Sequence, residues 1–163
     1  IEKTIKDINR AIGYGTFPLA TINDKKEASI IVISEKTKRE ARAEFAKADC
    51  RLHEEAEGTS CIGYSSKGVI LESHIWASKA LPASEWRATL LHEVLHALGF
   101  QGHSYVALDS VMSFGTPSYK TAARLNALEL KTLFLLYRHL KPFDREARVR
   151  AAFDKHWGDI EIP

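Results

Sequence analysis

The sequence predicts an α+β fold in a single domain that covers residues 1–163. Isoleucine recurs at helical spacing at the start of the chain, and β-branched runs predict short strands in the first half. Leu-rich segments in the second half predict further helices. A length of 163 residues suits one domain with a real core and is short for two.

Composition excludes several classes of protein. Hydrophobic residues make up 45% and charged residues 27% of the chain, as in a globular protein. The formal net charge is +2, with Lys and Arg scattered among Asp and Glu, so we expect no nucleic-acid partner. No apolar run approaches the roughly 18 residues that a membrane span requires, so we expect none.

Periodicity and punctuation predict the elements of the first half. A helix comes first, because its isoleucines precede two glycines. Runs of β-branched and alternating residues predict strands, and a stretch rich in Ala, Glu, Lys and Arg predicts a second helix among them. We therefore expect a helix at 1–12, a strand at 28–34, a helix at 36–48, and strands at 60–65 and 69–77.

The second half is predicted to be mainly helical. Ser84 is the expected N-cap of a helix that Gly99 ends. Residues 100–123 carry several Gly, Ser and Pro residues and predict an irregular connection. Two further helices are expected at 124–139 and 144–157.

The two cysteines, Cys50 and Cys61, flank a short polar stretch. We predict a disulfide between them, which would contribute roughly 3 kcal/mol under the loop-entropy model; two free thiols are the alternative. A disulfide favours a secreted or periplasmic location. Because the chain begins at Ile1, we expect a processed or truncated form from which any signal peptide has been removed.

The pentapeptide HEVLH at residues 92–96 carries the main functional signal. On a helix, His92 and His96 share one face, so both imidazoles can reach one zinc ion at roughly 2.0–2.1 Å. Glu93 lies about 100° further around the helix, beside the metal, where it can accept a proton from a zinc-bound water. Two histidines that only satisfy hydrogen bonds on a buried helix are the alternative.

The motif and its surroundings resemble the metzincin clan of zinc peptidases, whose signature is HExxHxxGxxH followed by a turn that carries a methionine. Residues 92–99 match the first four defined positions. The third histidine comes one residue late, at His103 instead of Gly102, and His103-Ser104 looks like the end of the signature in the matrix-metallopeptidase branch. Met112 follows at a distance similar to that of the Met-turn.

This resemblance implies a metzincin-like single domain with a small twisted mixed sheet, an active-site helix, a Met-turn and C-terminal helices. Its upper part would cover about 1–99 and its lower part about 100–163. Residues 125–137 resemble the C-terminal helix of the clan, and the resemblance as a whole covers about 69–137. Upstream it is weak, because metzincins begin with a strand and this chain begins with a predicted helix.

The resemblance also implies a zinc ion held by His92, His96 and His103, with Glu93 as the catalytic base. Asp109 is the alternative third ligand, since carboxylates also bind zinc. The implied activity is a zinc-dependent endopeptidase acting on a peptide or protein, which we expect to be a monomer. A catalytically silent zinc-containing binding or inhibitory domain on the same fold is the alternative.

Further expectations concern the cleft. The strand at 69–77 would be an edge strand that pairs with extended substrate, and the loop at 114–119 would shape the pocket. Phe114 stands where some metzincins have a tyrosine that helps the metal, which leaves Tyr105 or Tyr119 to stabilise the oxyanion. The remaining histidines are expected at the surface: His53, His74, His139 and His156. For His74, a contact with substrate is the alternative.

Overall fold

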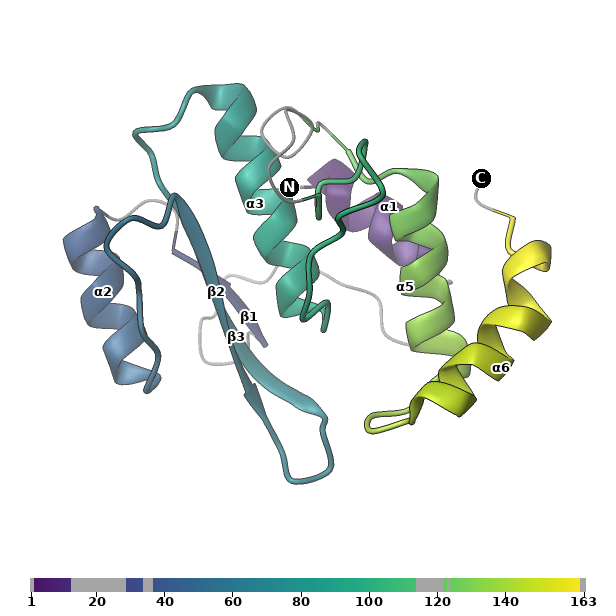
Figure 1. The fold of residues 1–163 in the computed structure, drawn as a ribbon. Coiled ribbons are helices and arrows are strands. Elements are labelled where there is room, and N and C mark those ends of the chain that lie inside the picture. The colour runs from purple at the N-terminus through teal and green to yellow at the C-terminus, as the bar shows by residue number, and fades with distance from the viewer. Residues whose placement is uncertain (1, 13–28, 34–36, 114–121, 123, 162–163) are drawn as a thin grey trace. The chain divides into compact units, whose positions relative to one another are not determined.

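The protein has an α+β fold with a small three-stranded mixed sheet, as predicted (Figure 1). The chain divides into two compact units, residues 22–124 and residues 1–21 with 125–163, which are described separately below. The prediction of a single catalytic domain stays a prediction. The computed structural model describes residues 2–12, 29–33, 37–113, 122 and 124–161.

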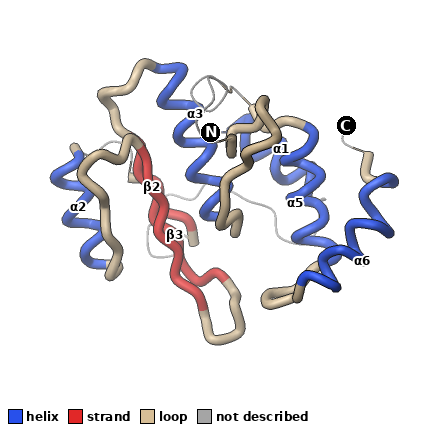
Figure 2. The backbone as a smooth tube through the Cα atoms, viewed as in Figure 1, coloured by secondary structure: helices blue, strands red, loops and turns tan. Residues whose placement is uncertain are grey.

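The sheet lies in the unit of residues 22–124 and consists of β1 (Ile30–Val32), β2 (Gly58–Tyr64) and β3 (Ile70–Ala77). The strand order is β1-β3-β2, with β1 parallel and β2 antiparallel to β3. Figure 2 shows the strands in red, with β2 and β3 side by side. The expectation that the strand at 69–77 lies at an edge is therefore wrong. Strand order depends on long-range pairing, and β1 pairs with the side of β3 that β2 leaves open.

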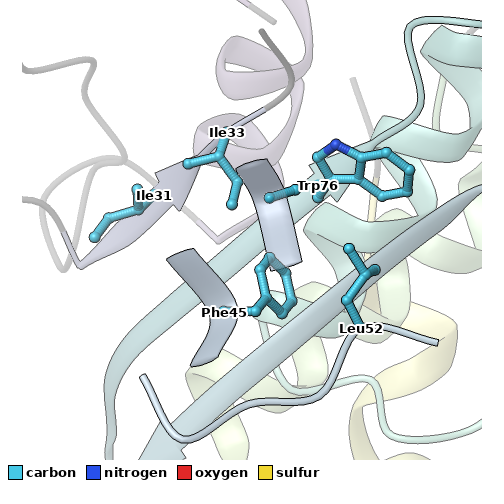
Figure 3. Packing of buried hydrophobic residues seen from close by; sticks show 6 residues of the cluster. Ile31, Ile33, Phe45, Leu52 and Trp76 are labelled. Atoms are coloured by element: carbon cyan, nitrogen blue, oxygen red, sulfur yellow. The ribbon is translucent and has the colours of Figure 1, made fainter. Parts of the chain in front are cut away.

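Helix α2 (Lys38–Lys47) and helix α3 (Ala83–Ala97) cover opposite faces of this sheet. Thr37 and Glu40 form a capping box that fixes the start of α2. Two apolar clusters fix the two layers. The α2 side is packed by Ile31, Ile33, Phe45, Leu52 and Trp76 (Figure 3), and the α3 side by Ile75, Ala77, Leu90 and Ala97.

Helix α3 differs from its prediction at the N-terminal end only. Pro82 is the N-cap, with φ −52° and ψ 149°, and makes no side-chain cap hydrogen bond. The extended backbone at Pro82 turns the chain into the helix before Ser84, so the Ser84 N-cap prediction is wrong. Gly99 follows the C-cap residue Leu98 at φ +103°, in the region that favours glycine, and ends the helix as predicted.

A disulfide joins Cys50 to Cys61 with a Cα–Cα distance of 6.1 Å, and this confirms the predicted pairing. It ties the segment after α2 to the middle of β2. Both cysteines pack against the apolar cluster on the α2 side of the sheet. Since side chains alternate along a strand, the neighbours Ser60 and Ile62 face the other side.

The second unit is helical. Arg138 donates a hydrogen bond from Nε to the carbonyl oxygen of Ile12, 2.7 Å away. A capping box of Asn126 and Glu129, which our predictions missed, begins the middle helix. None of the described helices combines the length and apolar character needed to cross a bilayer. The elements are α1 (Glu2–Ile12), α5 (Ala127–His139), α6 (Glu146–His156) and a 3₁₀ helix, η1 (Trp157–Asp159).

Candidate metal centre

Three histidines converge at the C-terminal end of α3. His92 and His96 lie one turn apart on the helix, with their Nε2 atoms 2.9 Å apart. His103, from the loop after the helix, places its Nε2 atom 3.2 Å from that of His92. The three ligand nitrogens all lie within 4.8 Å of one another, so these side chains could hold a metal ion.

Backbone carbonyls orient two of these rings. His92 donates from Nδ1 to the carbonyl oxygen of Val111 at 2.8 Å, and His96 donates from Nδ1 to the carbonyl oxygen of Phe100. A ring nitrogen that faces a carbonyl oxygen carries the proton, so Nε2 of each neutral ring presents a lone pair. Hydrogen bonds of this kind are typical partners of metal-binding histidines.

The surroundings keep the imidazoles of His92 and His96 neutral. The pKa of His92 is lowered to about 4, mainly by burial and in part by the nearby His96 and His103, against the opposing effect of the Val111 carbonyl. Burial also lowers the pKa of His96, with a further contribution from His103. At neutral pH both rings are therefore in the form that binds a metal ion.

The geometry bears on the choice between two candidate third ligands. The chain places His103 with the other two histidines, although it comes one residue later than in the pattern. Gly102, the position that the pattern assigns to the third ligand, is exposed and has no side chain to bind a metal. Asp109 is also exposed and is not part of the metal-binding group among the described residues.

Backbone hydrogen bonds connect the segment around Met112 to the loop after His103 and to His92. Ser104 donates its backbone N–H to the carbonyl oxygen of Met112 at 2.7 Å. The Met112 side chain is 3% exposed, and the preceding residue, Val111, is the one that accepts from His92. This buried segment therefore holds the His92 ring through a backbone carbonyl.

Glu93 lines the same cleft as the three histidines. The cleft has a volume of about 400 Å³, and the Glu93 side chain is 5% exposed. Burial raises the pKa of Glu93 to about 7, although a hydrogen bond from Ser60 lowers it in part. The cleft is lined by Gly58, Thr59, Ser60, Ile62, Tyr64, His92, Glu93, His96, Gln101 and His103.

The sequence predictions missed the wall that β2 forms. Ser60, Ile62 and Tyr64 alternate along the strand and face the cleft, and Gln101 donates to the Tyr64 hydroxyl at 2.6 Å. The alternation of GTSCIGY was the available signal, but it did not identify β2 as the strand beside α3.

Other predicted residues lie elsewhere. Tyr105 is described and 75% exposed, whereas Phe114 and Tyr119 lie outside the described residues. His74 is 7% exposed and contacts the Phe45 ring on the α2 side, so its predicted surface position is wrong. The helix α2 covers this face of the strand, a contact that the strand sequence alone does not contain.

The other three histidines outside the metal-binding group, His53, His139 and His156, were also expected at the surface. His53 is exposed, as expected. His139 and His156 are half-buried and stack on each other, with ring centroids 3.7 Å apart, so both are partly solvated.

Comparison of the chain with known protein families, curated proteins and solved structures gives no significant match.

Proposed function

We propose that this chain is a zinc-dependent endopeptidase with a metzincin-like catalytic site. One observation carries the proposal: a buried carboxylate, Glu93, shares a cleft with three histidines whose nitrogens converge. The intact carboxylate distinguishes the site from one that only binds metal, because a ligand-only site has no use for it.

The donor set fits zinc. Two unprotonated nitrogens 2.9 Å apart repel each other unless a cation lies between them. A tetrahedral zinc ion with bonds of roughly 2.0–2.1 Å holds its nitrogens about 3.3 Å apart, close to the observed spacing. When bound by His92, His96 and His103, zinc would supply an activated water and polarise a peptide carbonyl.

Glu93 performs the proton transfers in this proposal. Its carboxylate takes the proton of the attacking water and then delivers a proton to the leaving amine. Burial raises the pKa of Glu93 above that of a free carboxyl group, which favours a group that must both accept and donate a proton. Burial in the wall between α3 and β2 keeps bulk water from competing for the same proton.

The edge strand β2 is the proposed docking site for substrate main chain. Among the described strands, only β3 pairs with it, and its side chains line the cleft. An extended peptide could add to this edge by backbone hydrogen bonds. The disulfide at Cys61 supports a secreted or periplasmic location, where such a bond persists.

The test compares the wild type with Glu93→Gln and with His53→Ala, an exposed histidine outside the cluster. Metal content and cleavage of a fluorescent peptide library are measured, with and without a chelator. We expect Glu93→Gln to retain zinc but lose activity by at least about a hundredfold, and His53→Ala to behave as wild type. Undiminished cleavage in Glu93→Gln would sink the assigned role. Zinc without any cleavage by the wild type would favour the silent binding domain.

A further inference from the structure

We propose that Ser60 is a positioning residue for Glu93: its hydroxyl, on the edge strand β2, holds the carboxylate in the orientation that proton transfer requires. The proposal deepens the proposed function and rests on it. It assigns to β2 a second task, distinct from docking of the substrate main chain.

The strand and the helix approach each other closely at this point. A Cβ added at Gly58 would overlap Cγ2 of Thr89 and lie 3.0 Å from Oε1 of Glu93. Glycine at position 58 therefore lets β2 lie directly against the turn of α3 that carries Glu93. Two residues further along the strand, Ser60 faces the same side.

The Ser60 side chain lies beside the Glu93 carboxylate in the wall of the cleft. Both residues line the same cleft, the Glu93 side chain is almost completely buried, and the Ser60 hydroxyl opposes the rise of the Glu93 pKa as a hydrogen-bond donor does. A carboxylate has two oxygens, so a bond to one leaves the other for the proton of the attacking water. Fixing a flexible side chain in its reactive geometry is the ordinary task of a residue behind the catalytic group.

Ser60 is itself held in place. Its backbone pairs with Ile75 in the central strand, and the next residue, Cys61, is tied by the disulfide to Cys50. The hydroxyl therefore projects from a rigid element. Ser60 is not among the three converging histidines, so we expect its loss to leave metal binding unchanged.

The first experiment separates positioning from binding. Ser60→Ala, Ser60→Thr and the exposed control Ser66→Ala are compared for kcat, KM and zinc affinity, the last by competition with a chromogenic chelator. We expect Ser60→Ala to lower kcat about tenfold, with KM and zinc affinity within about twofold of wild type. Ser60→Thr keeps the hydroxyl and should restore most of kcat. A change in KM alone, or a Ser60→Ala enzyme with wild-type kcat, would overturn the proposal.

The second experiment needs no activity. A double-mutant cycle of Ser60→Ala with Glu93→Ala is measured by chemical unfolding of the metal-free full chain. The hydrogen bond predicts non-additivity of about fivefold in the unfolding constant, whereas Ser66→Ala with Glu93→Ala should be additive. Additive Ser60 and Glu93 effects would refute the contact. If the wild type cleaves nothing, the proposed function fails while the cycle still decides whether Ser60 holds Glu93.

Discussion

In the cleft, the rings of His92 and His96 stand edge to face, at an interplanar angle of 82°, and direct their Nε2 atoms at each other. In the helical unit, His139 and His156 lie nearly parallel, at 12°, with ring centroids 3.7 Å apart. The rings of His92 and His103 are also nearly parallel, at 19°, but their centroids are 5.0 Å apart and their Nε2 atoms are 3.2 Å apart. Convergence of the ligand nitrogens, and not closeness of the rings, distinguishes the metal-binding group from the packing contact.

The electrostatic surroundings of the cleft histidines also differ from those of the stacked pair. The backbone carbonyls of Val111 and Phe100 accept hydrogen bonds from Nδ1 of His92 and His96, so Nε2 of each ring carries the lone pair that a cation can bind. The pKa of His139 is lowered by burial and then by positive neighbours, among them His156, Lys155 and Arg138. One environment is arranged to hold a cation, and the other repels it.

The largest expected effect is on metal affinity. His92→Ala removes one of three converging nitrogens and should weaken zinc binding by well over a hundredfold, beyond the 10–100-fold that is typical of outer-shell changes. His139→Ala should leave the affinity unchanged. Competition with a chelator of known affinity measures both, and equal losses would erase the distinction between the two groups.

The next effect is on stability as a function of pH in the metal-free protein. The pKa of Glu93 rises from 4.5 to about 7 on folding, so the folded chain binds more protons in that window. Wild-type stability contributed by this group is therefore present below pH 4.5 and lost as the pH rises to about 7. Glutamine does not titrate, so the Glu93→Gln variant has no such pH-dependent loss of stability.

The free energy of unfolding of Glu93→Gln should therefore rise relative to that of the wild type between pH 4.5 and about 7, by up to about 3 kcal/mol. Denaturant unfolding at intervals of half a pH unit measures it. Glu55→Gln, at an exposed position, corrects for the general effect of removing one negative charge. A difference that stays flat with pH would mean that Glu93 is not buried as described.

Two glycine substitutions compare how closely the chain is packed at the contact between β2 and α3 and in the 3₁₀ helix η1. Gly58→Ala would overlap Thr89, so we expect a loss of about 1–3 kcal/mol in the free energy of unfolding. Gly158→Ala, in η1, meets nothing within 4 Å and should cost little. Thermal or denaturant unfolding of both variants gives the comparison, and a tolerated alanine at 58 would argue against close contact between β2 and α3.

The smallest effect concerns the stacked pair. His156→Gln removes a positive neighbour and should raise the pKa of His139 toward its ordinary value by less than about one unit. Titration followed by NMR of the imidazole signals measures the change, with His53→Gln as the control. A fall in the pKa of His139 would show that the ring contact, and not charge, dominates this group.

Local patterns predicted much of the fold. Isoleucine spacing predicted α1, β-branched runs predicted the strands, and Gly99 ended α3, because each signal is confined to a few neighbouring residues. HEVLH predicted two converging histidines for the same reason: helical spacing fixes their relation. Asn126-x-x-Glu129 was an equally local signal that was overlooked.

The missed features depend on which elements meet. Strand order placed β2 at the edge, and the close approach at Gly58 brought Ser60 to Glu93 across the sheet–helix interface. Burial of His74 likewise requires α2 to cover its strand. Such contacts arise from long-range packing, which spacing along the chain does not encode.

The disulfide has a consequence for how this chain can vary. It closes a segment of the surface between Cys50 and Cys61, in which His53, Glu54 and Glu55 are exposed. Both ends of that segment are anchored, one by the bond and the other by strand pairing. Substitutions or short insertions at its tip can therefore change the outer surface of the protein while the wall behind Ser60 keeps its position.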